Sequence, residues 1–492
     1  MKISHLFKDT AIYGIATILP RLLNLILTPL HTSAENLSTT QYGIYQGLFA
    51  YMIMGNVLLT YGMETAFFRF INKQSSVAVK KIVQATALTS LFTTTSIFVI
   101  FAFLLRHQIA SWVGYEVAFV EYAVVILALD TLAAIPFAWC RAKGRSIHYT
   151  IIKVGNVFVN LFLNLFFFLC LPHLAKENPA MWNWLIMEDK VHYIFISNLI
   201  ASLLTLISLI PLYIKIGFAY CFSSWKQMFV YAFPVLVAGV AFSINEGFDR
   251  IFIRALYPAD EADTVVGMYA GCYKLGVFMS LFITAYKLGV EPFFFSTATN
   301  RYAPETYAKV TQYFIIFGSL IFLFAGSYTH VIKHLLIPNP SYWKALDIVP
   351  VILLSNFCLG IYHSLSVWYK VTDRTWYGAY ISIIGGIITI ITNLLLIPVM
   401  GYFGSALATL LAYGSMMIIS FWVGQKKYPI PYNLKKILMY LLTSTALTCI
   451  NFYILGKNLI VGTIFVLLFM TMIFYLERKE LLYILKTARK KK

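Results

Sequence analysis

Residues 376–423 read WYGAYISIIGGIITIITNLLLIPVMGYFGSALATLLAYGSMMIISFWV and contain no Asp, Glu, Lys or Arg. A helix that crosses the hydrocarbon core of a bilayer needs about 20 mostly apolar residues, so this stretch is long enough for two crossings. Met400 and Gly401 form the only break between the two apolar blocks. Two crossings joined by so short a break are typical of a chain that spans the membrane many times.

The same alternation of apolar blocks and short polar breaks extends through all 492 residues. The chain is 60% hydrophobic and 12% charged, with a mean hydropathy of +0.76. We therefore expect an all-α polytopic membrane protein of about fourteen transmembrane helices. This excludes a soluble enzyme, a disordered protein and a receptor with a single anchor. The predicted spans are 10–31, 44–67, 82–104, 117–138, 151–171, 191–214, 228–252, 265–290, 310–330, 346–369, 376–398, 402–423, 435–456 and 458–476.

The first apolar block, from about Thr10 to Leu30, contains Arg21 and is longer than a signal-peptide core, so we interpret it as a retained span.

The absence of several motifs argues against catalysis and cofactors. The six cysteines include no CxxC pair, which predicts neither a zinc site nor a disulfide framework but apolar, buried thiols. No GxxxxGK[ST], HExxH or GxSxG motif is present. We expect a protein that is not an enzyme and binds no metal or cofactor.

The net charge of +18 is best explained by membrane topology. Lys and Arg are enriched in cytoplasmic segments of membrane proteins. With the N-terminus inside, the inside segments carry 27 Lys and Arg and the outside segments carry 7. This predicts an even number of spans and two cytoplasmic termini. The basic tail, which ends in Lys490–Lys492, is expected to face anionic lipid headgroups rather than nucleic acid.

The two halves of the chain match each other at a shift of about 229 residues. This shift covers six predicted spans, so the two halves share one orientation, as in transporters built from parallel repeats. We expect a six-helix bundle at 1–220, a second at 221–427 related to it by pseudo-two-fold symmetry, and two further helices with a basic tail at 428–492. The matched pairs are Trp139 with Trp368, Arg141 with Lys370, Arg145 with Arg374, Asn164 with Asn393, Gly43-Ile44-Tyr45 with Gly267-Met268-Tyr269, and Glu64 with Glu291.

Two sequence motifs resemble a known superfamily. The run Tyr-Gly-Ile-Tyr at 42–45 opens the second span, and Tyr-Lys-Leu-Gly-Val-Glu-Pro-Phe-Phe-Phe at 286–295 closes the eighth. With two six-span bundles, they resemble the multidrug/oligosaccharidyl-lipid/polysaccharide (MOP) exporters. The seventh and eighth spans are most similar to those of Wzx-type polysaccharide flippases. Fourteen spans also suit MurJ-type lipid II flippases, whose last two spans line a groove for a lipid tail, and the choice stays open.

The resemblance implies a function and its partners. A Wzx-type protein moves an undecaprenyl-diphosphate-linked oligosaccharide, an O-antigen, capsule or similar glycan precursor, from the cytoplasmic to the outer leaflet by alternating access. It lies in the bacterial cytoplasmic (inner) membrane and works beside the glycan polymerase or glycosyltransferases of its pathway. The alternatives are a MurJ-type flippase for peptidoglycan synthesis and a MATE-like cation-coupled drug antiporter, which would need an anionic cavity.

Four cationic residues inside the predicted spans are candidates for binding the substrate diphosphate. Ionisable residues in a membrane span usually face a cavity, and Arg and Lys are the side chains that bind phosphate. Arg21 follows Pro20 in the first span, Arg250 lies in the seventh, and Lys274 and Lys287 lie in the eighth. The alternatives are an internal salt bridge for Arg21 and Lys274, a local ion pair or snorkelling for Arg250, and snorkelling to the interface for Lys287.

Five acids are candidates for coupling-ion binding or gating. Glu246 and Asp249 are three residues apart in the seventh span, and Asp130 lies alone in the fourth. A carboxylate in a low dielectric titrates readily, so H⁺ and Na⁺ both remain open as the coupling ion. Glu64 and Glu291 occupy matching places at the inner ends of the second and eighth spans. They predict either a cytoplasmic gate or structural bridges to Arg69 and Arg301.

Overall fold

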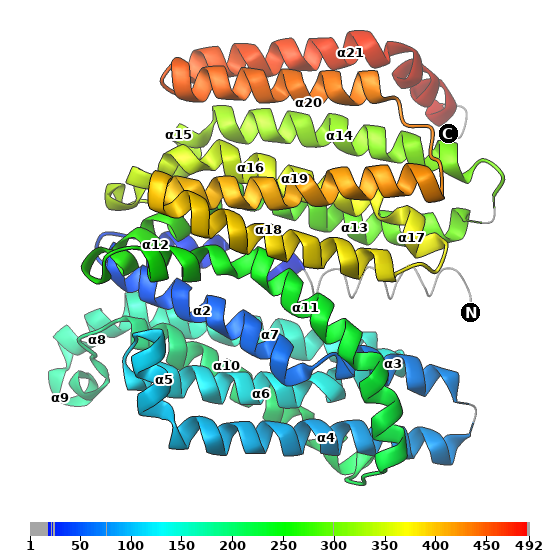
Figure 1. The fold of residues 1–492 in the computed structure, drawn as a ribbon. Coiled ribbons are helices and arrows are strands. Elements are labelled where there is room, and N and C mark those ends of the chain that lie inside the picture. The colour runs from blue at the N-terminus through cyan, green and yellow to red at the C-terminus, as the bar shows by residue number, and fades with distance from the viewer. Residues whose placement is uncertain (1–17, 21, 23–24, 75, 299, 490–492) are drawn as a thin grey trace. The chain divides into compact units, whose positions relative to one another are not determined.

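The computed structural model describes residues 18–20, 22, 25–74, 76–298 and 300–489, and every regular element in them is a helix (Figure 1). Within these residues, twelve helices are long and apolar enough to cross a membrane. They match the last twelve predicted spans one to one, which confirms the all-α polytopic fold. They are Val77–Leu104, Val117–Ala142, Ser146–Glu177, Val191–Ile216, Phe222–Leu256, Ala259–Phe295, Ala303–Ser327, Pro340–Val371, Trp376–Met400, Tyr402–Lys427, Leu434–Ile454 and Leu459–Arg478.

The first two predicted spans have different outcomes. Most of 10–31 lies outside the described residues. The block 44–67 is not one continuous helix, because it contains most of α2 (Thr39–Thr60) and the start of α3 (Met63–Lys73). The predicted count of about fourteen is therefore approximate.

The break between α2 and α3 has a steric cause. Tyr61 (φ 35°) and Gly62 (φ 71°) both adopt the left-handed conformation, which ends a right-handed helix. A Cβ on Gly62 would lie 2.6 Å from the carbonyl oxygen of Ala232. Two features therefore require glycine at position 62. One is the left-handed backbone conformation, and the other is the close contact with a neighbouring helix. The short α3 that follows carries Glu64.

The chain forms two compact units. Unit 1 comprises Met1–Gly271 with Ser382–Ser405, and unit 2 comprises Cys272–Ile381 with Ala406–Lys492. The predicted domain boundaries at 220 and 427 remain a prediction. The elements that follow α2 and α3 in the first segment of unit 1 are α4 (Val77–Leu104), α5 (Arg106–Val113), α6 (Val117–Ala142), α7 (Ser146–Leu165), η1 (Phe166–Cys170), α8 (Leu171–Glu177), α9 (Pro179–Trp182), η2 (Asn183–Leu185), α10 (Val191–Ile216), α11 (Phe222–Leu256) and α12 (Ala259–Tyr273).

Unit 1 is built around helix α6, which packs against α2, α4 and α10. Helix α7 packs against α10. Helix α11 packs against α2 and α3. An apolar core of unit 1 contains Trp139 of α6, which is 3% exposed, together with Phe67 of α3, Leu88 of α4 and Met228 of α11. This core fixes the ends of α3 and α6, where Glu64 and Arg141 lie.

The helices of unit 2 include the pair that the sequence predicts as an addition to the repeats. Helices α20 and α21 both pack on α14. Figure 1 shows α20 next to α14. Their shared core contains Leu323 of α14, Tyr440 of α20 and Phe469 of α21. Beyond α12, the elements are η3 (Lys274–Gly276), α13 (Val277–Thr297), α14 (Ala303–Ser327), α15 (Thr329–Leu336), η4 (Pro340–Ile348), α16 (Val349–Leu365), α17 (Val367–Val371), α18 (Trp376–Met400), α19 (Tyr402–Lys427), α20 (Leu434–Cys449), η5 (Ile450–Ile454) and α21 (Leu459–Arg489).

The two shortest predicted breaks are confirmed. Gly401 (φ 60°) separates α18 from α19, and a Cβ there would lie 2.3 Å from the Tyr257 hydroxyl oxygen. Gly456 (φ 64°) and Lys457 (φ 63°) lie before α21. All six cysteines are free, and Cys140, Cys272 and Cys358 are buried as expected. Cys221 and Cys449 are half-buried and Cys170 is exposed, which corrects the expectation of six buried thiols.

Candidate functional site

Unit 1 contains a polar cavity of about 330 Å³ among helices that are otherwise apolar. Its charged lining residues come from three elements, with Glu64 on α3, Asp130 and Arg141 on α6, and Lys153 on α7. Two carboxylates and two cations thus face one space, which is a costly arrangement within a membrane span and indicates a functional cavity. The remaining lining residues are Asn56, Thr60, Ala133, Ala134, Phe137, Tyr149, Asn156, Asn198, Ser202 and Thr205.

The hydrogen bonds of the cavity fix its polar groups in defined positions. The Ser202 hydroxyl donates to Asp130 Oδ1 at 2.8 Å. Asn156 Nδ2 donates to Thr205 Oγ1 at 2.9 Å. Lys153 Nζ lies 4.5 Å from the centroid of the Phe137 ring, within the range of a cation–π contact. Asp130 is therefore held by a neighbouring hydroxyl.

The ion pair between Arg141 and Glu64 lies at the same cavity. In unit 2, Lys370 Nζ lies 2.6 Å from Glu291 Oε1, and these are the residues that the repeat matches to Arg141 and Glu64. Both acids form ion pairs, but with Arg141 and Lys370 in place of the expected partners Arg69 and Arg301, and the choice between a gate and a structural bridge stays a prediction. The Arg69 guanidinium lies over the Tyr231 ring, 4.1 Å from its centroid.

A second, smaller chamber of about 160 Å³ shares Asn156 and Asn198 with the charged cavity. Its polar lining has a different character, because it consists of amides and ring groups without a Lys, Arg, Asp or Glu among the described residues. The side chains that give it this character are His31, Tyr45, Phe49, Asn156, Asn160 and Asn198. The two chambers together offer a charged part and a neutral, hydrogen-bonding part.

Two buried asparagines at matched positions connect neighbouring helices. Asn164 Oδ1 lies 2.8 Å from His31 Nε2, and its amide donates to Asn160. Asn393 Oδ1 accepts from the Ser405 hydroxyl at 2.7 Å. Both asparagines are fully buried. The side-chain partners differ, but both amides also donate to the backbone carbonyl four residues earlier in their helix, that of Asn160 and that of Thr389.

The acidic residues of α11 do not line either chamber. Asp249 and Arg250 are buried, 6% and 8% exposed, and form an ion pair of 3.5 Å. This is the local pair considered as the alternative for Arg250. Glu246 is exposed although it lies only three residues before Asp249.

The other predicted cations are placed as follows. Arg21 lies outside the described residues. Lys274 begins the 3-10 turn η3, Lys287 lies within α13, and both are half-buried side chains of unit 2. Of the predicted site residues, the charged cavity brings together Asp130 and Glu64.

The cavity also shows what sequence reasoning missed. Lys153 and Arg141 are two of the 27 Lys and Arg residues in the predicted inside segments, yet both line the cavity. The signal was available, because Lys153, Asn156, Asn160 and Asn164 follow one another at spacings of three and four residues along α7. That spacing places them on one face of a helix.

Unit 2 has an apolar cleft of about 240 Å³ between α14, α16, α19 and α20. Apart from the hydroxyls of Thr311 and Tyr432, its lining is apolar, and Trp422 and Leu438 are exposed at it. Such an apolar lining suits lipid chains better than it suits a polar ligand.

Comparison with known proteins places this geometry in a family. The family model described as polysaccharide biosynthesis protein matches residues 6–297, more than half of the chain. The chain belongs to this family. It is a MOP-superfamily protein, and its family and structural neighbours are transporters and flippases. No curated protein matches the sequence significantly.

Solved structures share the fold of this polysaccharide biosynthesis family member at low sequence identity. A lipid II flippase MurJ in an inward closed conformation is 15% identical, with a TM-score of 0.70 over 94% of this chain and 98% of its own. An inward-facing MATE family multidrug transporter is 12% identical, with a TM-score of 0.59 over 83% and 97%. A MOP transporter from Pyrococcus furiosus is 13% identical, with a TM-score of 0.56 over 86% and 94%.

Proposed function

We propose that the protein is a flippase that moves a polyprenyl-diphosphate-linked oligosaccharide from the cytoplasmic to the outer leaflet of a bacterial cytoplasmic membrane by alternating access. The observation that carries this proposal is the charged cavity of unit 1 in a member of a polysaccharide biosynthesis family. A diphosphate needs cations, and Lys153 and Arg141 supply them within membrane-spanning helices. Both termini are proposed to lie in the cytoplasm.

The two chambers suit the two parts of such a headgroup. The cavity with Lys153 and Arg141 would receive the phosphates, whereas the chamber lined by Asn160, Asn198 and Tyr45 would receive neutral sugar hydroxyls. Amides offer both donors and acceptors, as hydroxyl recognition requires. Four further residues are proposed as substrate contacts because of their positions in the sequence, namely Arg21, Lys274, Lys287 and Arg250.

The same cavity supports a proposal for coupling. Asp130 is an intramembrane carboxylate whose Oδ1 accepts a hydrogen bond from the Ser202 hydroxyl. We propose Asp130 as the site of the coupling ion, H⁺ or Na⁺. Glu64 and Glu291 are proposed to act in gating through their ion pairs, and Glu246 and Asp249 remain further candidates for either role.

The test is transport by the purified protein in vesicles that contain a fluorescent polyprenyl-diphosphate-linked oligosaccharide. Lys153→Ala should slow translocation about tenfold or more, because a charge-assisted contact to phosphate is lost, and Lys153→Arg should keep most of it. Lys143→Ala, which removes an exposed lysine beyond the cavity, is the control. Wild-type vesicles without glycan translocation would overturn the proposal.

A second candidate is the MurJ-type flippase, favoured by the TM-score of 0.70 to a lipid II flippase and by the additional pair α20 and α21. Vesicles with fluorescent lipid II in place of the oligosaccharide lipid separate the two cargoes. A drug antiporter is less well supported, because the two carboxylates of the cavity are balanced by Lys153 and Arg141 and the cavity is not anionic.

A further inference from the structure

The end of unit 2 that the charge distribution places outside carries cations around one indole ring. Lys333 of α15 is 9% exposed, and its Nζ lies 3.8 Å from the centroid of the Trp343 ring. The His334 ring packs edge-on against the same indole at a centroid distance of 4.6 Å, and His330 lies 5.3 Å from His334. Trp343 Nε1 donates to the Ile337 carbonyl at 2.9 Å, which fixes the ring. A lysine and two imidazoles thus gather at one place.

A second lysine comes from a distant part of the chain. Lys457 lies in the turn before α21, with its Nζ 4.5 Å from the centroid of the Phe452 ring. The Tyr453 hydroxyl donates to the Asp347 carbonyl at 2.6 Å, which ties η5 to η4, the element that carries the indole. Burial lowers the pKa of Lys333, and the nearby charge of Lys457 lowers it further, so the two ammonium groups repel each other. The outer cation cluster thus consists of Lys333, Lys457, His330 and His334.

The backbone of Lys457 is unusual for a residue with a side chain. Its φ of 63° is in the left-handed region, directly after Gly456 at 64°. Its N–H donates to the Asn451 carbonyl at 2.8 Å, which closes the turn. Glycine or asparagine would adopt this conformation at lower cost than lysine. A residue held in a costly conformation is a reason to look for a function of its side chain.

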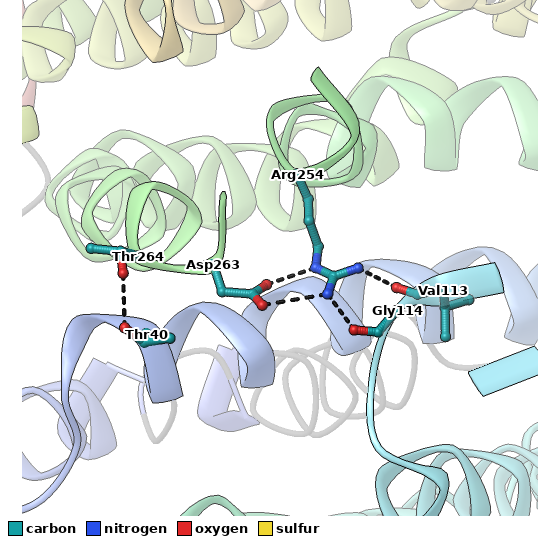
Figure 2. A network of polar contacts seen from close by, with 6 residues as sticks. All are labelled: Thr40, Val113, Gly114, Arg254, Asp263 and Thr264. Carbon is teal, nitrogen blue, oxygen red and sulfur yellow. Dashed lines mark hydrogen bonds and ion pairs between the residues drawn. The ribbon is translucent and has the colours of Figure 1, made fainter. Parts of the chain in front are cut away.

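An outer cation of unit 1 shows what the outer cation cluster lacks. Arg254 Nε donates to Asp263 Oδ1 at 2.7 Å, and its two Nη atoms donate to the carbonyls of Val113 and Gly114 (Figure 2). Within the described part of the chain, no carboxylate or carbonyl makes such a contact with the ammonium group of either lysine in the cluster. Two neighbouring ammonium groups without a protein acceptor favour an anion from outside the chain.

The exposed apolar side chains beside the cluster favour a lipid over a free anion. Two side chains of α15, those of Val331 and Leu335, are 50% and 71% exposed. Ile454 and Ile460, on either side of Lys457 in the sequence, are both 73% exposed. A phospholipid offers a phosphate to the cations and acyl chains to these side chains, whereas inorganic phosphate offers only the first.

We propose that the outer cation cluster binds the phosphate of an anionic phospholipid in the outer leaflet, so that one lipid headgroup bridges α15 and the turn before α21. Such a lipid would hold the additional pair of helices to the end of α14. The site rests on the contacts of Lys333 and Lys457, whereas the leaflet rests on the distribution of Lys and Arg. Neither depends on the cargo that is proposed for transport.

Lipid binding to the purified full-length protein tests the site. We expect native mass spectra to show bound phosphatidylglycerol, and the unfolding temperature to rise with its concentration more than with that of phosphatidylcholine, which has no net charge. Lys333→Gln/Lys457→Asn should weaken phosphatidylglycerol binding about tenfold or more, because two charge-assisted contacts are lost. Lys176→Gln, which removes an exposed lysine of unit 1 from the predicted outer side, is the control.

A second variant separates binding from folding. Lys457→Gly removes the charge and relieves the left-handed backbone, so without lipid it should unfold at or above the wild-type temperature, yet it should lose several-fold in phosphatidylglycerol affinity. Equal affinities of wild type, Lys457→Gly and the double variant would overturn the site. Stabilisation by inorganic phosphate at the same affinity as by phosphatidylglycerol would overturn the lipid.

The leaflet has its own test. In a background without the six native cysteines, a membrane-impermeant maleimide should label Lys344→Cys in intact cells, because Lys344 is exposed next to the indole of the cluster. Labelling only in inside-out vesicles would overturn the outer leaflet. These measurements use no transported substrate, so a protein that binds phosphatidylglycerol but moves no glycan would overturn the proposed function and leave the lipid site intact.

Discussion

Lys370 Nζ and Glu291 Oε1 lie 2.6 Å apart in unit 2, and the pair repeats the contact of Arg141 with Glu64 in unit 1. Glu64 lies in the first turn of α3 and Glu291 lies within α13, both near the inner ends of predicted spans. The side chains of Lys370 and Glu291 are 27% and 42% exposed, so the pair contributes about 1 kcal/mol or less to stability. We therefore expect the pair to affect the conformational changes of transport more than the free energy of folding.

We predict that exchanging the charges of this pair preserves function. Glu291→Lys and Lys370→Glu alone should each reduce glycan translocation, because two like charges then face each other. The double variant Glu291→Lys/Lys370→Glu should recover most of the rate. Translocation in reconstituted vesicles is the measurement, and the matching exchange at Glu64 and Arg141 is a second test. A double variant as impaired as the worse single one would show that the pair is not the relevant contact.

We predict that Asp130→Asn uncouples transport from its ion gradient. Asparagine keeps an acceptor for the Ser202 hydroxyl but removes the charge. Translocation should lose its response to imposed H⁺ and Na⁺ gradients, whereas Ser202→Ala should weaken the response without abolishing it. Each gradient is imposed separately on the vesicles. An intact response in Asp130→Asn would exclude this carboxylate as the coupling site.

We predict that Lys436→Met destabilises the protein by more than about 1 kcal/mol. Lys436 Nζ lies 2.9 Å from Glu477 Oε1, and the side chain of Glu477 is 3% exposed. The variant leaves a buried carboxylate with only the Tyr440 hydroxyl and the Gln312 amide as its hydrogen-bond donors. Thermal unfolding in detergent measures the loss.

Two variants control this prediction. Lys435→Met, next to it and exposed, should leave the unfolding temperature unchanged. Adding Glu477→Gln to Lys436→Met should restore part of the loss, because the unpaired charge is removed. Equal effects of Lys435→Met and Lys436→Met would contradict the role of the pair.

We predict that Ser405→Ala lowers stability by about 1 kcal/mol, a usual value for a hydrogen bond between membrane helices. The variant removes the hydroxyl that donates to the fully buried Asn393 Oδ1. Ser208→Ala is the matched control, because the Ser208 hydroxyl is exposed and bonds only the Leu204 carbonyl of its own helix. Denaturation of purified protein measures both, and indistinguishable results would argue that Asn393 finds another donor.

The fold was predictable because it follows from local composition. Apolar blocks such as 376–423 need no tertiary information to be recognised as spans, and Gly401 marks their boundary. The break of the second span at Tyr61 and Gly62 was not predicted, because the composition of 44–67 suits a single span. The contact that favours glycine at position 62, with the Ala232 carbonyl, joins residues far apart in the sequence and is not visible in local composition.

The candidate site was predictable in part. Asp130 and Glu64 stand out as acids in apolar spans, and both line the charged cavity. Lys153 did not stand out, because a lysine near the inner end of a span satisfies the positive-inside pattern equally well. The partner of Glu64 could not be deduced either, because Arg69 is closer in sequence but Arg141 is brought to it by the packing of α3 on α6.

The packing of α20 and α21 on α14 has a consequence for the ancestry of the fold. Gly326 of α14 is so close to Thr448 of α20 that a Cβ on it would lie 2.4 Å from the threonine methyl group. A version of the chain cut back to its two repeats would expose this small-residue surface, and with it Gln312, to lipid. The extra pair is thus an integral part of the molecule, and its loss or gain in evolution would require compensating substitutions along α14.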